Sequence, residues 1–197
     1  MKTIKQLIFV ILLIIFSCNS GEKSTGDSIV FGIYETVNLN EIPLSVLNEI
    51  KNSVVEFGYD SVQPIIGQVS KSDSTSSQYD FHKEAIRLLK TKYSLGGDKE
   101  LVSLIALRLN PTISNWDIRK TKSRGRNIEI HFTMSGAKKW ADMVKKNEGR
   151  NIAFVLNDQV YSISHINGKI NNGAALLSGF DDEITAGKIS DLLNNES

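Results

Sequence analysis

Residues 127–146 have the sequence NIEIHFTMSGAKKWADMVKK, in which the spacing of the apolar residues changes partway along. In the first part three apolar residues alternate with polar ones, which predicts a strand with one buried face. From Ser135 onward the apolar positions recur every three or four residues, which predicts a helix capped by Ser135 and ending at Lys146. A strand that leads directly into an amphipathic helix indicates an α+β fold.

The residues on either side extend this pattern. We expect a strand over 116–121 that forms a hairpin with 127–133, a second hairpin over 152–163 that turns at Asn157 and Asp158, a strand over 174–177, and a last helix capped by Asp181 or Asp182. This order predicts helices packed on an antiparallel or mixed sheet.

The first half of the chain is less regular. We expect a strand over 29–34, a helix over 42–57, a strand over 62–69 and a second helix over 81–95 that Gly96 and Gly97 terminate. Residues 101–109 are mostly apolar, so periodicity leaves helix and strand open.

The chain begins with the pattern of an export signal. Lys2 and Lys5 precede ten apolar residues, a run too short to span a bilayer. Ser17 and Cys18 follow at once, as in the signal of a bacterial lipoprotein, where the thiol receives a diacylglycerol group. We therefore expect Cys18 to carry the lipid (diacylglycerol and palmitate); the alternative is an uncleaved anchor helix with an incidental cysteine.

Composition limits the classes of partner. Lys and Arg number 23 and Asp and Glu 22, so no excess positive charge favours nucleic acid. Cys18 is the sole cysteine, which excludes a disulfide within one chain. We predict a signal peptide over 1–17, a lipidated tether over 18–28, an N-terminal α+β region over 29–109 and a second domain over 110–197. The expected location is the bacterial cell envelope, facing the periplasm or the outside.

The sequence contains no recognisable catalytic, cofactor or metal motif, so we expect no enzyme and no cofactor. Asp181 to Glu183 could form a metal cluster, but helix capping and a favourable interaction with the helix dipole explain all three residues, and we prefer that interpretation. Trp116 and Trp140 are expected in the core, with Trp116 the better candidate for a contact residue. A basic hairpin is expected at Arg119, Lys122, Arg124 and Arg126. It binds an acidic partner or lipid headgroups, or it is simply a solvated hairpin.

Six short matches occur in one register over residues 128–193. FTMSGAKK over 132–139 resembles F-T-x-x-G-A-x-K, and NEGRNIAFVL over 147–156 resembles N-x-G-K-x-L-A-I-V-L. The matches at family spacing continue with Val160 to Ser162, then Ile166, Ile170, Gly173, Gly179 and Phe180, and finally Ala186 and Leu192. Together they resemble the head part of the first periplasmic domain of SecD and SecDF, accessory subunits of the Sec export machinery. Gly136 then lets a helix start against a strand, and Gly149 ends that helix in a left-handed conformation.

The resemblance implies a head module that contacts emerging polypeptide. The family's membrane helices and proton-coupling carboxylates do not follow residue 197, so we expect no proton-driven motor. The family has a proline where Ser164 stands, and we expect a binding loop at Ser164, His165, Asn167 and Lys169. The leading hypothesis is a non-enzymatic envelope lipoprotein that binds polypeptide during or after export. The alternative is a scaffold or an inhibitor of immunity type that binds one folded envelope partner.

Overall fold

The computed structural model describes residues 28–51, 54, 64–72, 80–81, 84–93, 100–168 and 173–196. Its helices are α1 (Leu44–Lys51), α2 (Met134–Lys146) and α3 (Glu183–Asn195), with short 3-10 turns at Leu39–Glu41 and Asn115–Asp117. Its strands are β1 (Phe31–Glu35), β2 (Ile65–Ser70), β3 (Asp80–Phe81), β4 (Ile86–Thr91), β5 (Leu101–Arg108), β6 (Ile113–Ser114), β7 (Ile118–Arg124), β8 (Asn127–Phe132), β9 (Asn151–Leu156), β10 (Gln159–His165) and β11 (Ala174–Leu177). The expected α+β class is confirmed.

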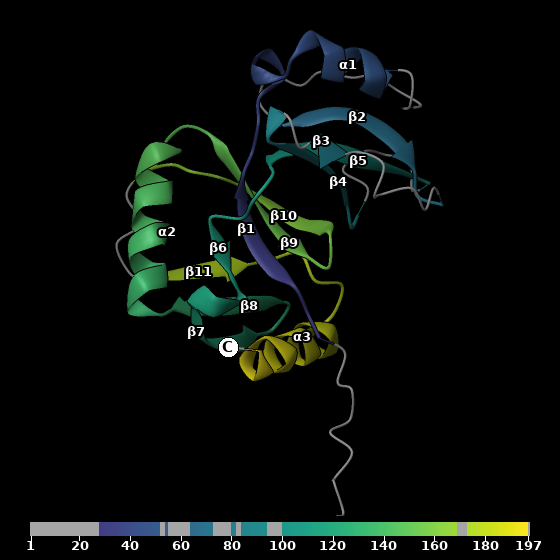
Figure 1. The fold of residues 1–197 in the computed structure, drawn as a ribbon. Coiled ribbons are helices and arrows are strands. Elements are labelled where there is room, and N and C mark those ends of the chain that lie inside the picture. The colour runs from purple at the N-terminus through teal and green to yellow at the C-terminus, as the bar shows by residue number, and fades with distance from the viewer. Residues whose placement is uncertain are drawn as a thin grey trace, which may run out of the picture.

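The strands form two sheets. The large sheet has the order β2-β5-β4-β10-β9-β1-β6, with β3 paired to β4, and the small sheet has the order β11-β8-β7. Adjacent strands are antiparallel except β4 and β10, which run parallel over a two-residue ladder. Figure 1 shows α1 and α3 at opposite ends of the molecule, with α2 along one side.

The helices cover different hydrophobic clusters. Val46 and Ile50 of α1 pack with Ile86 and Leu88 of β4 in one cluster. The largest cluster joins α2 and α3 to both sheets, and the Phe132 and Trp140 rings in it lie 5.5 Å apart between their centroids. A buried hydrogen bond, 2.7 Å from the Thr121 hydroxyl to the Ser190 carbonyl, fixes α3 on the small sheet. The small sheet is therefore held in place by the same core as the large one.

Strand β1 belongs to the predicted N-terminal region, but it pairs with strands of the predicted second domain. It lies between β9 and β6, and its register pairs Ile33 with Phe154. Phe31 and Ile33 are fully buried in the cluster that contains the C-terminal helices. The division into 29–109 and 110–197 stays a prediction, but a segment from the first part completes the sheet and core of the second.

The prediction of a helix over 81–95 is wrong. In the described part of that range the chain forms β3 and β4, with Gly96 and Gly97 outside the described residues. Leu88 is buried in the cluster under α1, whereas its neighbour Leu89 is buried in another cluster. A strand buried on both faces shows no period of two, so its apolar residues imitate helical spacing.

Other predictions need smaller corrections. Helix α1 covers Leu44–Lys51 and Val54 is not helical, while the other residues of the expected helix beyond Lys51 lie outside the described residues. The apolar segment after residue 100 is strand β5. Thr133, not Ser135, caps α2, because its side chain accepts a 3.0 Å hydrogen bond from the Gly136 N–H. The Thr133 cap precedes the first helical residue, where free N–H groups need acceptors.

The tight turns agree with the sequence. Asn157 and Asp158 have φ angles of 45° and 60° between β9 and β10, as a two-residue hairpin turn requires. Asp182 caps α3 by accepting a 2.7 Å hydrogen bond from the Thr185 N–H. This confirms the capping role among the alternatives for the acidic cluster.

Candidate binding groove

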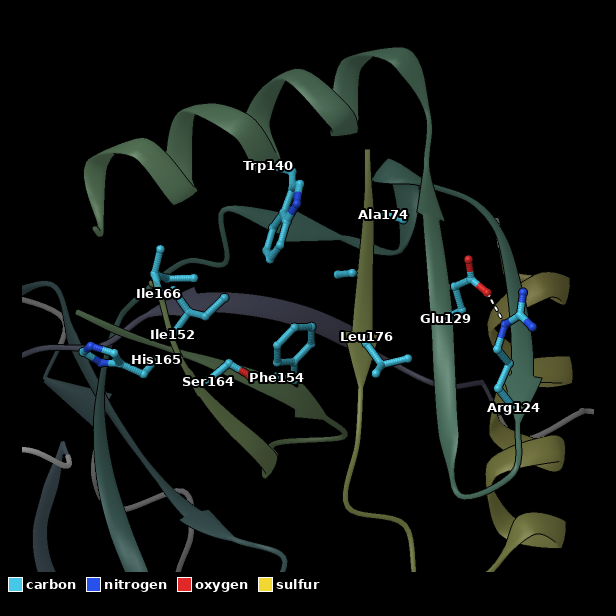
Figure 2. A pocket seen from close by; sticks show the side chains of 11 residues that line it. Arg124, Glu129, Trp140, Ile152, Phe154, Ser164, His165, Ile166, Ala174 and Leu176 are labelled. Atoms are coloured by element: carbon cyan, nitrogen blue, oxygen red, sulfur yellow. Dashed lines mark hydrogen bonds and ion pairs between the residues drawn. The ribbon is translucent and has the colours of Figure 1, made fainter. Parts of the chain in front are cut away.

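A groove of about 600 Å³ lies where the two sheets and α2 meet (Figure 2). One wall is β11 and the other is formed by the ends of β9 and β10, with Trp140 of α2 above them. Ile152, Phe154 and Ile166, which are fully buried in the core, form an apolar floor. The full lining is Arg124, Glu129, Trp140, Ile152, Phe154, Ser164, His165, Ile166, Ala174, Ala175 and Leu176.

Strand β11 is an edge strand and presents unpaired backbone to this groove. The Phe132 N–H donates to the Gly173 carbonyl at 3.1 Å, which makes residues 132 and 173 a hydrogen-bonded pair. In an antiparallel ladder such pairs alternate, so the N–H and C=O groups of Ala174 and Leu176 point away from β8. No strand in the described part of the chain pairs with that edge. The Leu176 side chain is also 52% exposed.

The charged and polar side chains at the rim of the groove are paired with one another. Arg124 Nε forms an ion pair with Glu129, and His131 Nε2 lies 3.1 Å from the other oxygen of that carboxylate. The hydrogen bond from Arg124 holds the pKa of Glu129 below its ordinary value. On the opposite wall, His165 Nδ1 lies 3.2 Å from Asn151 Oδ1. The rim therefore carries paired charges around an apolar interior.

One polar atom at the groove has no partner. Trp140 is 2% exposed, and its Nε1 forms no hydrogen bond in the described structure. In Figure 2 the indole nitrogen lies on the side of the ring that faces β11. Leaving a buried N–H without an acceptor costs about 1–3 kcal/mol, so such an atom needs an explanation.

The predicted binding loop is only partly a loop. Ser164 and His165 belong to β10 and pair with Ile152 and Asn151, which corrects the expectation that they replace a proline turn. They nevertheless line the groove, whereas Asn167 is an exposed residue after the strand. Lys169 lies outside the described residues. Two 2.9 Å hydrogen bonds follow this strand pairing. The Gly149 N–H donates to the Ile166 carbonyl, and the Ile166 N–H donates to the Arg150 carbonyl.

The predicted basic hairpin does not act as one unit. Arg119 and Lys122 are exposed on β7, but Arg124 pairs with Glu129 and Arg126 Nε donates to the Phe180 carbonyl at 2.8 Å. Only Arg124 of this set lines the groove. A role for the hairpin in binding stays a prediction.

Sequence reasoning named Arg124, Ser164 and His165, which line the groove, but it missed the apolar residues that shape it. Trp140 was expected in the core, which is correct, and nothing in its spacing distinguishes an unpaired indole nitrogen from a paired one. Trp116, also expected in the core, is 84% exposed because it stands in the 3-10 turn before β7. The edge position of β11 depends on the sheet order, which local periodicity does not encode.

A second cavity, of about 500 Å³, is polar and separate from the groove. Its lining includes Lys71, Lys92, Tyr93 and Asp181. Burial, with a smaller effect from the Asp181 carboxylate, raises the pKa of Tyr93 to about 12. Among the described residues, no three His, Cys, Asp or Glu side chains gather as metal ligands.

No helix in the described ranges has the length and apolar character needed to cross a membrane. Cys18, the predicted lipidation site, lies outside the described residues. Two sheets, three helices and a groove at an open strand edge define the described chain as an α+β domain of mixed sheet topology.

Residues 109–197 match the family model "SecDF, P1 head subdomain", so this part of the chain is similar to a SecDF P1 head. The protein translocase subunit SecD of Rickettsia felis is 26% identical over 129 residues, which are 66% of this chain and 21% of that protein. The chain thus spans about a fifth of the length of this relative. The predicted resemblance is confirmed for the head domain.

Solved SecDF structures are also similar to the chain. One, described as a membrane component that enhances protein export, has a TM-score of 0.49 at 16% identity, covering 85% of this chain and 62% of that chain. SecDF from Thermus thermophilus has a TM-score of 0.40 at 17% identity, covering 86% of this chain and 20% of the other.

Proposed function

We propose that this chain is a non-enzymatic envelope lipoprotein whose head-like domain binds polypeptide during or after protein export. The observation that carries the proposal is the apolar groove beside the open edge of β11. An open edge supplies main-chain hydrogen bonds to any extended chain, without reading its sequence. The SecD relative supports a link to export, because its name describes it as a protein translocase subunit.

The membrane association in this proposal rests on the first residues. The basic start, the short apolar run and the Ser17–Cys18 junction support cleavage before Cys18 and acylation of its thiol. Cys18→Ser is expected to leave the protein uncleaved or soluble, and mass spectrometry of the mature N-terminus measures this. A Cys18→Ser protein that is still cleaved at residue 17 and still bound to membranes would contradict lipidation.

A second function, binding of one folded envelope partner as scaffold or inhibitor, has its own observation. Trp116 is 84% and Met134 91% exposed, and the Thr133 N–H to Asp117 carbonyl bond joins the residues next to them. Exposed tryptophan is enriched in the energetic centres of protein interfaces. This surface lies outside the groove lining, so the two functions predict different contact sites.

Titration of the span 28–197 separates these functions. With a permanently unfolded, reduced and carboxymethylated protein, we expect amide shifts confined to β10, β11 and the residues of α2 around Trp140, at micromolar affinity. The same protein in its folded form is the control and should cause no shifts. If unfolded chains cause none, and a single folded envelope protein instead forms a stoichiometric complex that Trp116→Ala weakens, the scaffold function is correct.

A further inference from the structure

Two large apolar side chains are exposed where the turn before β7 meets the start of α2. Trp116 stands in that 3-10 turn, and Met134 is the first residue of α2. The hydrogen bond from the Thr133 N–H to the Asp117 carbonyl joins their sequence neighbours, so the two backbones are close. Single exposed apolar side chains are common, but large ones held together at one place indicate an interaction surface.

The turn that carries Trp116 is also bonded to the start of β1. The Asn115 side chain donates to the Ile29 carbonyl at 2.8 Å and accepts from the Phe31 N–H at 2.8 Å. These two bonds hold the residue next to Trp116 against the point where the chain enters the domain. The exposed surface therefore lies beside the domain's connection to the predicted tether.

The length of that tether favours a membrane over a free protein as the partner of this surface. Residues 19–28 join Cys18 to Ile29 and, even fully extended, span about 36 Å. A lipid on Cys18 keeps the surface close to the bilayer, so contact with the bilayer becomes an intramolecular event at high effective concentration. A folded partner that diffuses in the envelope has no such advantage.

We propose that Trp116 and Met134 insert into the headgroup region of the bilayer that holds the lipid on Cys18, and that this contact orients the domain on the membrane. The inference rests on the lipidation in the proposed function and deepens it by naming the face of the domain that meets the membrane. Tryptophan is enriched at membrane–water interfaces, because its ring combines an apolar body with a polar N–H.

The charges around the two side chains suit lipid headgroups. Three exposed cationic residues lie three or four positions after Trp116 or Met134 in sequence, namely Arg119, Lys120 and Lys138. Long cationic side chains keep their charge among phosphates while their stems contact apolar surface. The acidic residue of the turn, Asp117, is buried, and its carboxylate lies 2.8 Å from Lys139 Nζ. That carboxylate is therefore neutralised by a partner within the protein.

The test uses the full lipidated chain in vesicles of phosphatidylcholine and phosphatidylglycerol, with brominated lipids as the probe. Bromine quenches indole fluorescence at close range, and of the two tryptophans Trp116 is exposed and Trp140 is buried. We expect brominated lipids to quench part of the emission, and Trp116→Phe to remove the quenched part. Bromine placed near the glycerol should quench more than bromine at the ends of the acyl chains, because the ring lies at the interface.

A charge substitution with a matched control tests the orientation. Met134→Glu should lower the quenching of Trp116 by about half or more, because a carboxylate resists transfer out of water. Leu44→Glu is the control and should leave the quenching unchanged, since Leu44 is also exposed but belongs to α1, at the end of the molecule opposite β7 and α3 (Figure 1). Thermal melting of both variants verifies that they fold, and the quenching of the unmodified chain tests the inference without any variant.

The possible failures differ. If Cys18 carries its lipid and the protein is bound to vesicles, but brominated lipids leave the emission unchanged, the membrane contact is overturned while the lipoprotein function stands. Equal effects of Met134→Glu and Leu44→Glu would overturn the proposed orientation. A stoichiometric complex with one folded envelope protein that protects Trp116 from the brominated lipids would assign this surface to the scaffold function. If mass spectrometry finds no lipid on Cys18, both this inference and the proposed lipidation are overturned.

Discussion

The backbone of Gly136 in α2 lies directly against Asp117. A Cβ atom added to Gly136 would collide with the Asp117 carbonyl oxygen and would lie 2.8 Å from the Asp117 Cβ. The same carbonyl accepts a 2.8 Å hydrogen bond from the Thr133 N–H, and Lys139 Nζ lies 2.8 Å from the Asp117 carboxylate. The start of α2 is thus attached to the turn before β7 by contacts that only a glycine permits.

Gly136→Ala should destabilise the protein although alanine favours helices. The clash with Asp117 is with backbone, which cannot move aside cheaply, so we expect a loss of about 1–3 kcal/mol in urea unfolding. Gly187→Ala in α3 is the matched control, because no atom lies within 4 Å of its added Cβ. That variant should gain about 0.5–1 kcal/mol from helix propensity. Equal effects of the two substitutions would contradict the close approach.

Gly149→Val should cost about 1–3 kcal/mol for a different reason. Gly149 follows α2 with a φ angle of +75°, and no atom lies within 4 Å of an added Cβ. The penalty is therefore conformational and not a clash, so Gly149→Asn, which tolerates positive φ, should cost less than valine. Chemical denaturation measures both, and equal losses would show that φ is not the cause.

If residues 110–197 are a separate domain, that span should unfold cooperatively on its own. Strand β1 lies outside the span but packs into its core, which provides a test. The span lacks Phe31 and Ile33, which are buried between its own elements. We expect 28–197 to melt cooperatively and 110–197 to melt at a lower temperature and bind a hydrophobic dye. A synthetic peptide of residues 28–37 should raise that temperature. If 110–197 melts at the same temperature as 28–197, β1 is dispensable.

The cap of α3 should give a defined pH dependence. Hydrogen bonds from the Thr185 backbone and hydroxyl hold the pKa of Asp182 below its ordinary value. A carboxyl whose folded pKa is depressed stabilises the protein above its unfolded pKa, near pH 4, and loses that contribution as pH falls through the folded value. Asp182→Ala should therefore lower the urea midpoint at pH 7 and have a smaller effect at pH 2. An equal effect at both values would exclude the carboxylate as the cause.

Much of the second half is predictable because its signals are local. The alternation before Thr133, the helical spacing around Trp140 and the turn at Asn157 and Asp158 each lie within a few residues, and each is observed. Strand β4 was not predictable in this way. Leu88 and Leu89 are buried in different clusters, so only the layers on each side of the strand explain its pattern.

By itself, the sequence determined the α+β class, the resemblance to the SecDF head and most turns, since side-chain periodicity and backbone preferences act over short distances. Tertiary structure alone decided the candidate site. Trp140, Phe154 and Leu176 come from three elements that are distant in sequence, and they meet because β1 and β9 pair and β11 ends the small sheet. Whether a buried indole has a partner, or a strand has a free edge, depends on what packs beside it, which local sequence does not specify.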